Sequence, residues 1–172
     1  MINFEIKDLL DIYKLKTIIR YNQRQRIKDE NVAEHSFFVT MLTLQICNKL
    51  QLSDEITYKA IVKALLHDMP EIELNDITYP VKIGLNLYPL LKEYENKYYE
   101  KNFAKYADLM KDEESLVSII VDLADALSVF QYSINEESLG NTNFIDVKND
   151  TIDRLNKTYS KLMEAINNGN TL

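Results

Sequence analysis

Glycine and proline, the residues that most often form tight turns, occur only three times each in this chain of 172 residues. An all-β sandwich or barrel needs many such turns, so their scarcity favours helices joined by a few loops. The chain is 46% hydrophobic and 27% charged, which is the balance of a folded protein rather than a disordered one. We therefore predict an all-α fold, with a single domain over residues 1–172 and one core of about six helices.

The spacing of apolar residues predicts where these helices lie. In the second helix, Phe38, Leu42, Ile46 and Leu50 recur every fourth residue, which indicates a buried face. Ser53 precedes two acids and is expected to cap the third helix. The first helix is indicated by Phe4, Leu9, Ile12, Leu15 and Ile19. The predicted helices span residues 3–19, 31–50, 54–67, 89–107, 113–136 and 143–168, and residues 71–90 are predicted to form an ordered loop.

The charge and the cysteine content narrow the class of protein. A formal net charge of −7 disfavours sequence-independent binding to nucleic acid, which needs a basic surface. Neither a charged-then-apolar leader nor an apolar run of about 18 residues is evident, so we expect a cytoplasmic protein without a membrane partner. The single cysteine, Cys47, lies in the apolar stretch MLTLQICNKL and is expected to be buried rather than reactive.

Both histidines of the chain lie beside acids at the edges of apolar stretches: His35 follows Glu34, and Asp68 follows His67. Asp125 lies within LADALSVF, where a buried carboxylate is unfavourable unless it is paired or binds a metal. Imidazole nitrogens and carboxylate oxygens together suit a divalent transition metal. The candidate metal ligands are therefore His35, His67, Asp68 and Asp125, although each one alone could be a hydrogen-bonded core residue or a helix cap.

Four segments resemble, in order, those of the HD-domain metal-dependent phosphohydrolases, and within them the bacterial 5'-deoxynucleotidases and their phage relatives. The segments are ENVAEHS (30–36), HDMPEIELNDITYPVK (67–82), LADAL (123–127) and GNTNF (140–144). The resemblance implies that the four candidate ligands hold one divalent ion, for which Co, Mn, Zn, Fe and Ni remain open. It further implies that metal-activated water hydrolyses nucleoside 5'-monophosphates, and deoxynucleotides in particular.

The same resemblance assigns roles to four more residues. Glu71 and Asp76 match two acids of the family: Glu71 could position or deprotonate the attacking water, and Asp76 could protonate the leaving oxygen or hold the sugar. Arg20 matches an arginine at the substrate site, where a guanidinium suits phosphate oxygens. Tyr21 stands where relatives often carry tryptophan, which puts a strict preference for deoxyribose in question.

Other charged residues have two interpretations each. Positive charge at the site could be extended by Arg24, Arg26 and Lys28, which could instead be solvated surface charges. The metal ligands could be supported by Asp122 and Glu34, which could instead lie on the surface. Lys82 could contact a phosphate or a neighbouring subunit.

Three other functions are compatible with the sequence. A deoxynucleoside triphosphate hydrolase could use the same metal set, and a metal-stabilised nucleotide-binding module could lack turnover. A helical structural protein could carry the ligands by chance. The acids at Glu71 and Asp76 favour an enzyme, because a sensor does not need an acid beside the water. The resemblance also implies a homodimer or larger assembly.

Overall fold

The computed structural model describes residues 9–169, which form helices and, within that range, no strand. The long helices are α2 (Val32–Lys49), α3 (Asp54–Leu66), α6 (Tyr88–Asn102), α8 (Leu116–Ser138) and α9 (Ile145–Asn167). The short ones are α4 (Glu71–Leu74), α5 (Tyr79–Gly84) and α7 (Ala107–Lys111), with 3₁₀ helices η1 (Asp11–Lys16), η2 (Ala104–Tyr106) and η3 (Thr142–Phe144). The all-α prediction is confirmed, with eight α-helices in the described range instead of about six.

Side-chain caps set the starts of three of the long helices. Asn31 accepts a hydrogen bond from the backbone N–H of Glu34 at the start of α2, and Ser53 accepts one from Ile56 at the start of α3. Ser115 does the same for α8. Such caps satisfy N–H groups that have no partner inside the helix. The predicted starts of the second and third helices are thereby confirmed to within one residue.

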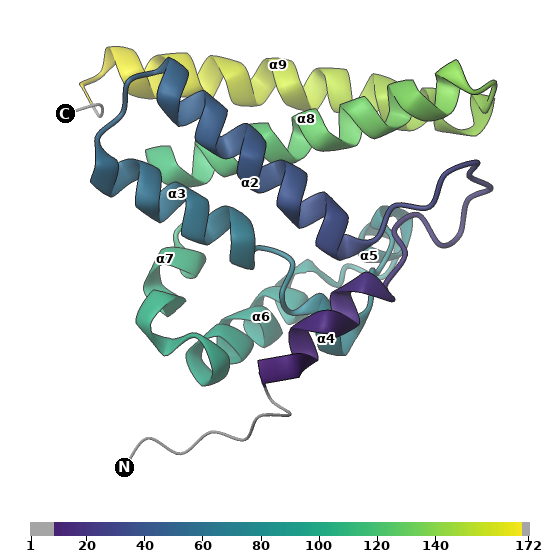
Figure 1. The fold of residues 1–172 in the computed structure, drawn as a ribbon, viewed down its shortest axis with the longest axis horizontal. Helices are drawn as coiled ribbons and strands as arrows, with labels where there is room; N and C mark the ends of the chain where they lie inside the picture. Colours follow the sequence, from purple (N-terminus) through teal and green to yellow (C-terminus); the bar gives the residue numbers. More distant parts are fainter. Residues whose placement is uncertain (1–8, 170–172) are drawn as a thin grey trace.

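The helices α8 and α9 run antiparallel and side by side, while α2 crosses α8 and α3 packs beside α2 (Figure 1). Their common core is a cluster of buried apolar side chains: Cys47, Ala60, Leu116, Val117, Ile120, Leu123, Leu162 and Ala165. Cys47 is fully buried in it, as predicted. A second cluster joins η1, α6 and α7 to the start of α2 through Leu15, Ile18, Val32, Met69, Tyr98, Tyr99 and Ala107. Helix α2 thus contributes to both clusters, through Val32 at its start and Cys47 near its end.

Two predicted apolar faces are wrong in part. In the described part of the first helix, Leu15 and Ile18 are buried whereas Leu9 and Ile12 are exposed. Residues 11–16 form a 3₁₀ helix, in which side chains repeat every three residues. Residues 3–8 of that prediction lie outside the described range.

In α2, Phe38 is 50% exposed, and the buried face consists instead of Val32, His35, Ser36, Val39, Thr43 and Cys47. Leu42, Ile46 and Leu50 of the predicted face do pack against the core while partly buried, so the prediction fails only at Phe38 and omits the polar residues of the buried face.

The predicted loop at residues 71–90 is also wrong, because it contains α4 and α5. Prolines explain this error. Pro80 and Pro89 lie in the first turns of α5 and α6, where a missing N–H costs nothing and the fixed φ angle suits a helix. The predicted helix at 89–107 correspondingly ends at Asn102, and the short η2 and α7 follow it.

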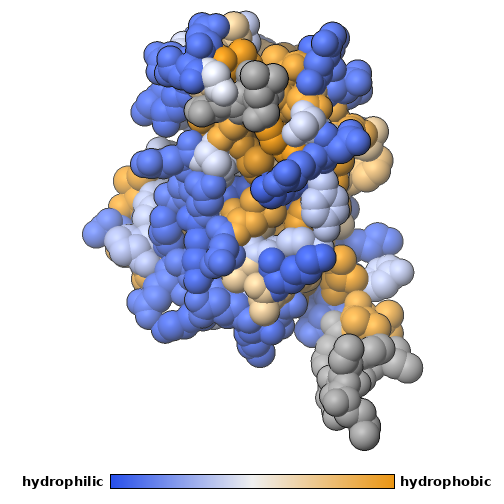
Figure 2. All heavy atoms as spheres, turned by 90° about the vertical axis from the view of Figure 1, so that its left-hand side faces the viewer, coloured by the Kyte–Doolittle hydropathy of each residue, from blue (hydrophilic) through white to orange (hydrophobic). Residues whose placement is uncertain are grey.

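By length and composition alone, α8 could cross a membrane, which corrects the expectation that no such apolar run is present. However, 56% of that stretch is buried within the protein, as is common for a central core helix. On the face shown in Figure 2, hydrophilic side chains predominate and hydrophobic ones lie between them in separate groups.

Candidate active site

Four side chains from three parts of the chain converge where α2, the end of α3 and α8 meet. His35 comes from the first turns of α2, His67 and Asp68 follow α3, and Asp125 lies in α8. His35 Nε2 lies 3.0 Å from Asp125 Oδ1 and 3.5 Å from Asp68 Oδ2. His67 Nε2 lies 3.2 Å from that same Asp68 oxygen. The ligand atoms of His35, His67 and Asp68 all lie within 4.8 Å of one another, so this group could hold a metal ion.

The two Nε2 atoms provide a test of whether this group fits a metal. Both atoms are buried and face carboxylate oxygens at 3.0 and 3.2 Å, but neither has the geometry of a hydrogen bond with a described residue. Buried polar atoms normally have a partner, and an imidazole nitrogen beside carboxylates is a typical ligand for a transition metal. The donor set of His35, His67 and Asp68 therefore fits a divalent transition metal.

The remaining nitrogen of each imidazole has a partner that orients the ring. His67 Nδ1 lies 2.7 Å from the carbonyl oxygen of Ala64, to which it can donate. His35 Nδ1 has two neighbours, Arg20 NH1 at 2.6 Å and Ser128 Oγ at 3.2 Å. Such partners fix the tautomer and the direction of metal-binding histidines. Tyr99 of α6 stabilises the turn that follows α3, because its hydroxyl donates a shared hydrogen bond to the carbonyl oxygens of Leu66 and His67.

Burial and charge act differently on the two histidines. Burial, reinforced by the neighbouring Arg20 guanidinium, lowers the pKa of His35 to about 4. Burial alone would also lower the pKa of His67, but the Asp68 carboxylate outweighs it and raises that pKa to about 9. Burial opposes the charge on Asp68 and Asp125, yet their histidine neighbours keep both carboxyl pKa values below the usual range. Both acids are therefore carboxylates at neutral pH, as metal ligands must be.

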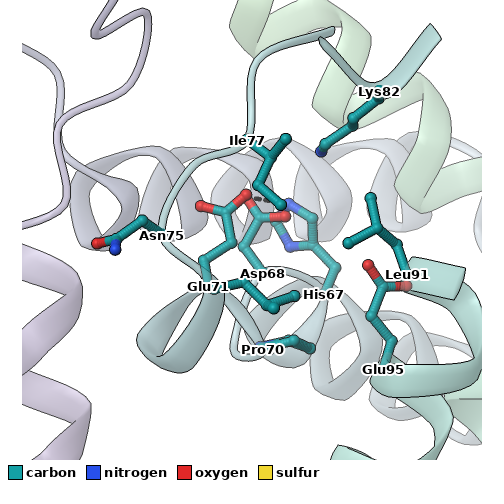
Figure 3. A pocket seen from close by; sticks show the side chains of 10 residues that line it. His67, Asp68, Pro70, Glu71, Asn75, Ile77, Lys82, Leu91 and Glu95 are labelled. Atoms are coloured by element: carbon teal, nitrogen blue, oxygen red, sulfur yellow. Dashed lines mark ion pairs between the residues drawn. The ribbon is translucent and has the colours of Figure 1, made fainter. Parts of the chain in front are cut away.

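Glu71 lies beside this group in a small hollow of about 50 Å³, lined also by His67, Asp68, Lys82 and Glu95 (Figure 3). It stands at the start of α4, one turn after the His67–Asp68 pair. Its Oε2 atom is buried without a hydrogen bond to a described residue. Burial, together with the charge of Asp68, raises the pKa of Glu71 to about 9. An acid of this kind, beside a candidate metal group, is suited to proton transfer.

Arg20 adjoins the same group from the loop that precedes α2. Its NH1 atom lies 2.7 Å from Glu30 Oε2 and 2.6 Å from His35 Nδ1. Glu30 is 8% exposed, so this is a buried ion pair. The guanidinium is thus held next to the candidate metal group.

Tyr21 and Asp76 are joined by a hydrogen bond from the Tyr21 backbone N–H to Asp76 Oδ2, 3.1 Å long. Tyr21 has a φ of 55° and Asn75, next to Asp76, has a φ of 58°. Non-glycine residues seldom adopt this left-handed conformation, and they concentrate at functional sites when they do. Two strained residues thus bring Tyr21 and Asp76 together across 55 positions of sequence.

The loop that carries Arg20 and Tyr21 is fastened to the end of α8. Glu136, which is fully buried, accepts hydrogen bonds from the backbone N–H groups of Ile27 and Lys28, each 2.8 Å long. Asn141 donates to the same carboxylate. The position of the loop is therefore set by α8, the helix that also carries Asp125.

A larger cavity of about 390 Å³ adjoins the candidate ligands on the side of α8 and α9. His67 and Asp125 line it, together with Asp122, Thr158 and Lys161 from these helices. His67 and Glu95 line both hollows, so the candidate metal group is reached from two sides.

The remaining charged candidates mostly have protein partners. Arg24 pairs with Asp146, and Arg26 pairs with Asp29, so neither is a free positive charge. Asp122 accepts hydrogen bonds from Arg154 and Thr158. The side chains of Lys28 and Glu34 are exposed.

Several neighbours of the site were not predicted. Glu30 pairs with Arg20, Ser128 contacts His35, Glu95 lines both hollows, and Arg154 binds Asp125. Glu30 lies within the segment ENVAEHS and could have been noticed as an acid near a buried arginine. For Arg154 no local signal exists, because its contact depends on how α9 packs on α8.

Comparison with known proteins places these features in a family. The model of the family described as 5'-deoxynucleotidase YfbR-like matches residues 9–167. The chain is 27% identical to the 4'-phosphooxetanocin A phosphatase of Priestia megaterium, over 94% of this chain and 91% of that protein. It is 28% identical to the 5'-deoxynucleotidase of Erwinia tasmaniensis, over 86% and 80% of the two chains. In fold, it is similar to the cyanophage S-2L HD phosphohydrolase bound to dA and one catalytic Zn²⁺ ion, with a TM-score of 0.71, 17% identity and coverage of 99% and 98%.

Proposed function

The chain belongs to the YfbR-like 5'-deoxynucleotidase family, and from this premise we propose that it hydrolyses deoxynucleoside 5'-monophosphates at the His35, His67, Asp68 and Asp125 group. It is a metal-dependent phosphohydrolase, and its products are a nucleoside and phosphate. The observation that carries the proposed site is the pair of buried Nε2 atoms without hydrogen bonds, aimed between carboxylates. A divalent ion bound there would lower the pKa of a bound water and screen the charge of the phosphate.

Glu71 is the residue that we assign to proton transfer. Its free Oε2 atom borders the small hollow beside His67 and Asp68, which has room for water. With a pKa of about 9, Glu71 holds its proton near neutral pH in the metal-free protein, and a cation bound nearby would favour the carboxylate form, which can accept a proton from water. Positioning of the attacking water and its deprotonation are both compatible with this place.

Arg20 is the residue that we assign to the phosphate. If Nε2 of His35 serves as a ligand, the ring proton must lie on Nδ1, where Ser128 Oγ can accept it. With a proton on Nδ1, this nitrogen can no longer accept a hydrogen bond from Arg20 NH1, which lies 2.6 Å away. This N–H group then becomes available to a phosphate oxygen, while Glu30 continues to hold the guanidinium.

Asp76 and Tyr21 are assigned to the sugar. The Oδ2 atom of Asp76 is occupied by the Tyr21 backbone N–H, which leaves Oδ1 for a sugar hydroxyl or the leaving 5' oxygen. The substrate is a small nucleotide, and which base it carries remains open.

The choice of metal follows from the chemistry of the ligands, and the remaining features are proposed from the sequence and from membership of the family. The nitrogen and oxygen ligands allow Mn, Co, Fe, Ni or Zn. We propose one domain over residues 1–172, a cytoplasmic location, no nucleic-acid or membrane partner, and assembly as a homodimer or larger oligomer.

A screen of nucleoside mono-, di- and triphosphates with several divalent metals tests the proposal, with products separated by chromatography. Deoxynucleoside monophosphates should give nucleoside and phosphate. Tripolyphosphate from a deoxynucleoside triphosphate would instead indicate a triphosphohydrolase. Tight nucleotide binding without any turnover would indicate a binding module.

A further inference from the structure

We infer that Arg154 of α9 is a positioning residue that holds Asp125 so that one defined carboxylate oxygen faces the metal. Arg154 NH2 lies 2.8 Å from Asp125 Oδ2. The other oxygen of that carboxylate, Oδ1, faces His35 Nε2 at 3.0 Å. This inference rests on the proposed ligand set and adds to it a residue outside the segments that resemble the family.

The two oxygens of Asp125 therefore have different neighbours. A carboxylate that is free to rotate can offer one oxygen or both to a metal ion. With Oδ2 engaged by a guanidinium, only Oδ1 remains for the ion, and coordination positions stay open for water and substrate. Partners of this kind behind metal ligands typically change metal affinity by 10- to 100-fold.

Arg154 is itself held in place by a second acid. The same NH2 atom also binds Asp122, which stands one helical turn before Asp125 on α8. Thr158, one turn after Arg154 on α9, donates to the other oxygen of Asp122. Arg154 and Thr158 of α9 thus bind Asp122 and Asp125 of α8, two acids that line the larger cavity. The orientation of the Asp125 carboxylate therefore depends on how α9 packs against α8.

A neighbouring ion pair provides a matched control. Lys148 of α9 pairs with Glu137 of α8 at 2.5 Å, and so joins the same two helices without contacting a candidate ligand. If Arg154 only fastens α9 to α8, then Arg154→Ala and Lys148→Ala should affect the protein alike.

The experiment is a titration of Co²⁺ into metal-free natural protein and into Arg154→Ala, Arg154→Lys and Lys148→Ala variants, without substrate. The bound ion is followed by calorimetry and by its visible absorption spectrum, and folding by circular dichroism. We expect Arg154→Ala to bind Co²⁺ about 10- to 100-fold more weakly and with a changed spectrum. Arg154→Lys should recover part of the affinity, and Lys148→Ala should match the natural protein.

Equal affinity and equal spectra for the natural protein and Arg154→Ala would overturn the inference. Equal losses in Arg154→Ala and Lys148→Ala would overturn it too, since they would indicate helix docking alone. Because no nucleotide is present, the result is independent of the proposed substrate: failure to hydrolyse deoxynucleotides would refute that proposal and leave the role of Arg154 standing.

Discussion

The ring of Tyr21 lies parallel to that of Tyr132, with centroids 5.0 Å apart and planes 4° apart. Phe144 meets Tyr21 edge-on, and the Arg20 guanidinium lies 5.3 Å from the Tyr21 centroid. The Tyr21 hydroxyl is buried and makes no hydrogen bond with a described residue. Since Tyr132 covers one face of the ring, we expect a substrate to meet the edge and hydroxyl of Tyr21.

This arrangement leads to a prediction about sugar selection. A phenol leaves more space beside the sugar than an indole would, so Tyr21→Trp should discriminate deoxy from ribo substrates better than the natural protein. Shape alone supports a selectivity of at most about a hundredfold. The measurement is kcat/KM for paired deoxy- and ribonucleoside monophosphates. Tyr21→Phe is the control that separates the hydroxyl from the ring, and an unchanged ratio in Tyr21→Trp would mean that Tyr21 does not read the sugar.

A second prediction concerns His67. His67→Ala removes a proposed ligand whose buried Nε2 atom makes no hydrogen bond with a described residue, so both bound metal and hydrolysis should be lost. Metal content and turnover are measured together, with circular dichroism to verify the helices. Lys59→Ala, an exposed change on α3, the helix that ends just before His67, should keep both. Full activity in a metal-free His67→Ala protein would refute the assignment.

A third prediction separates Glu71 from the ligands. Glu71→Gln should keep the metal but reduce kcat by about a hundred- to ten-thousand-fold, the usual contribution of general acid or base catalysis. Glu73→Gln is a close control, because Glu73 lies in the same helix but is exposed and bonded to Tyr94. If Glu71→Gln also lost its metal, Glu71 would have to be counted among the ligands.

The affinity for metal should depend on pH through His67. Because the pKa of His67 is raised to about 9, this imidazole is protonated at neutral pH in the metal-free protein, and a metal must displace that proton. The affinity should therefore rise about tenfold per pH unit and level off above pH of about 9. His35 adds no dependence there, since its pKa is lowered to about 4. Calorimetric titrations between pH 6 and about 9.5 would test this; a constant affinity would contradict it.

Glu71 should also make the metal-free protein less stable as pH rises. The unfolded carboxyl loses its proton near its ordinary pKa, whereas the folded one keeps it up to about 9. Between these values the folded state binds more protons, so stability falls with increasing pH. Glu71→Gln removes this dependence and should stabilise the protein at pH 7 by about 1–3 kcal/mol, but hardly at pH 5. Denaturant unfolding at both pH values measures the difference; equal gains would contradict this origin.

The sequence was sufficient for the fold class and for the grouping of His35, His67, Asp68 and Asp125, because buried acids and histidines must find each other or a metal. It was insufficient where position depends on tertiary packing. In α2, Phe38 faces solvent while His35 and Thr43 face the core, contrary to a count of apolar residues.

The prolines give a wrong prediction at residues 71–90 for a related reason. Pro80 removes a donor, which suggested a loop, but in the first turn of α5 that donor has no partner to lose. Arg154 could not be predicted at all, because its partner Asp125 lies 29 positions away on a different helix.

The attachment of the Arg20 loop to Glu136 bears on how this chain can evolve. Glu136 follows Asp125 by eleven residues, which is three turns of α8, so the loop anchor and the acid project from the same face about 16 Å apart. Substitutions between them preserve this spacing. A single inserted or deleted residue between them rotates Glu136 by about 100° around the helix axis relative to Asp125. The loop that carries Arg20 would then no longer lie beside Asp125. Length changes are thus excluded from the middle of α8, although single substitutions there leave the spacing intact.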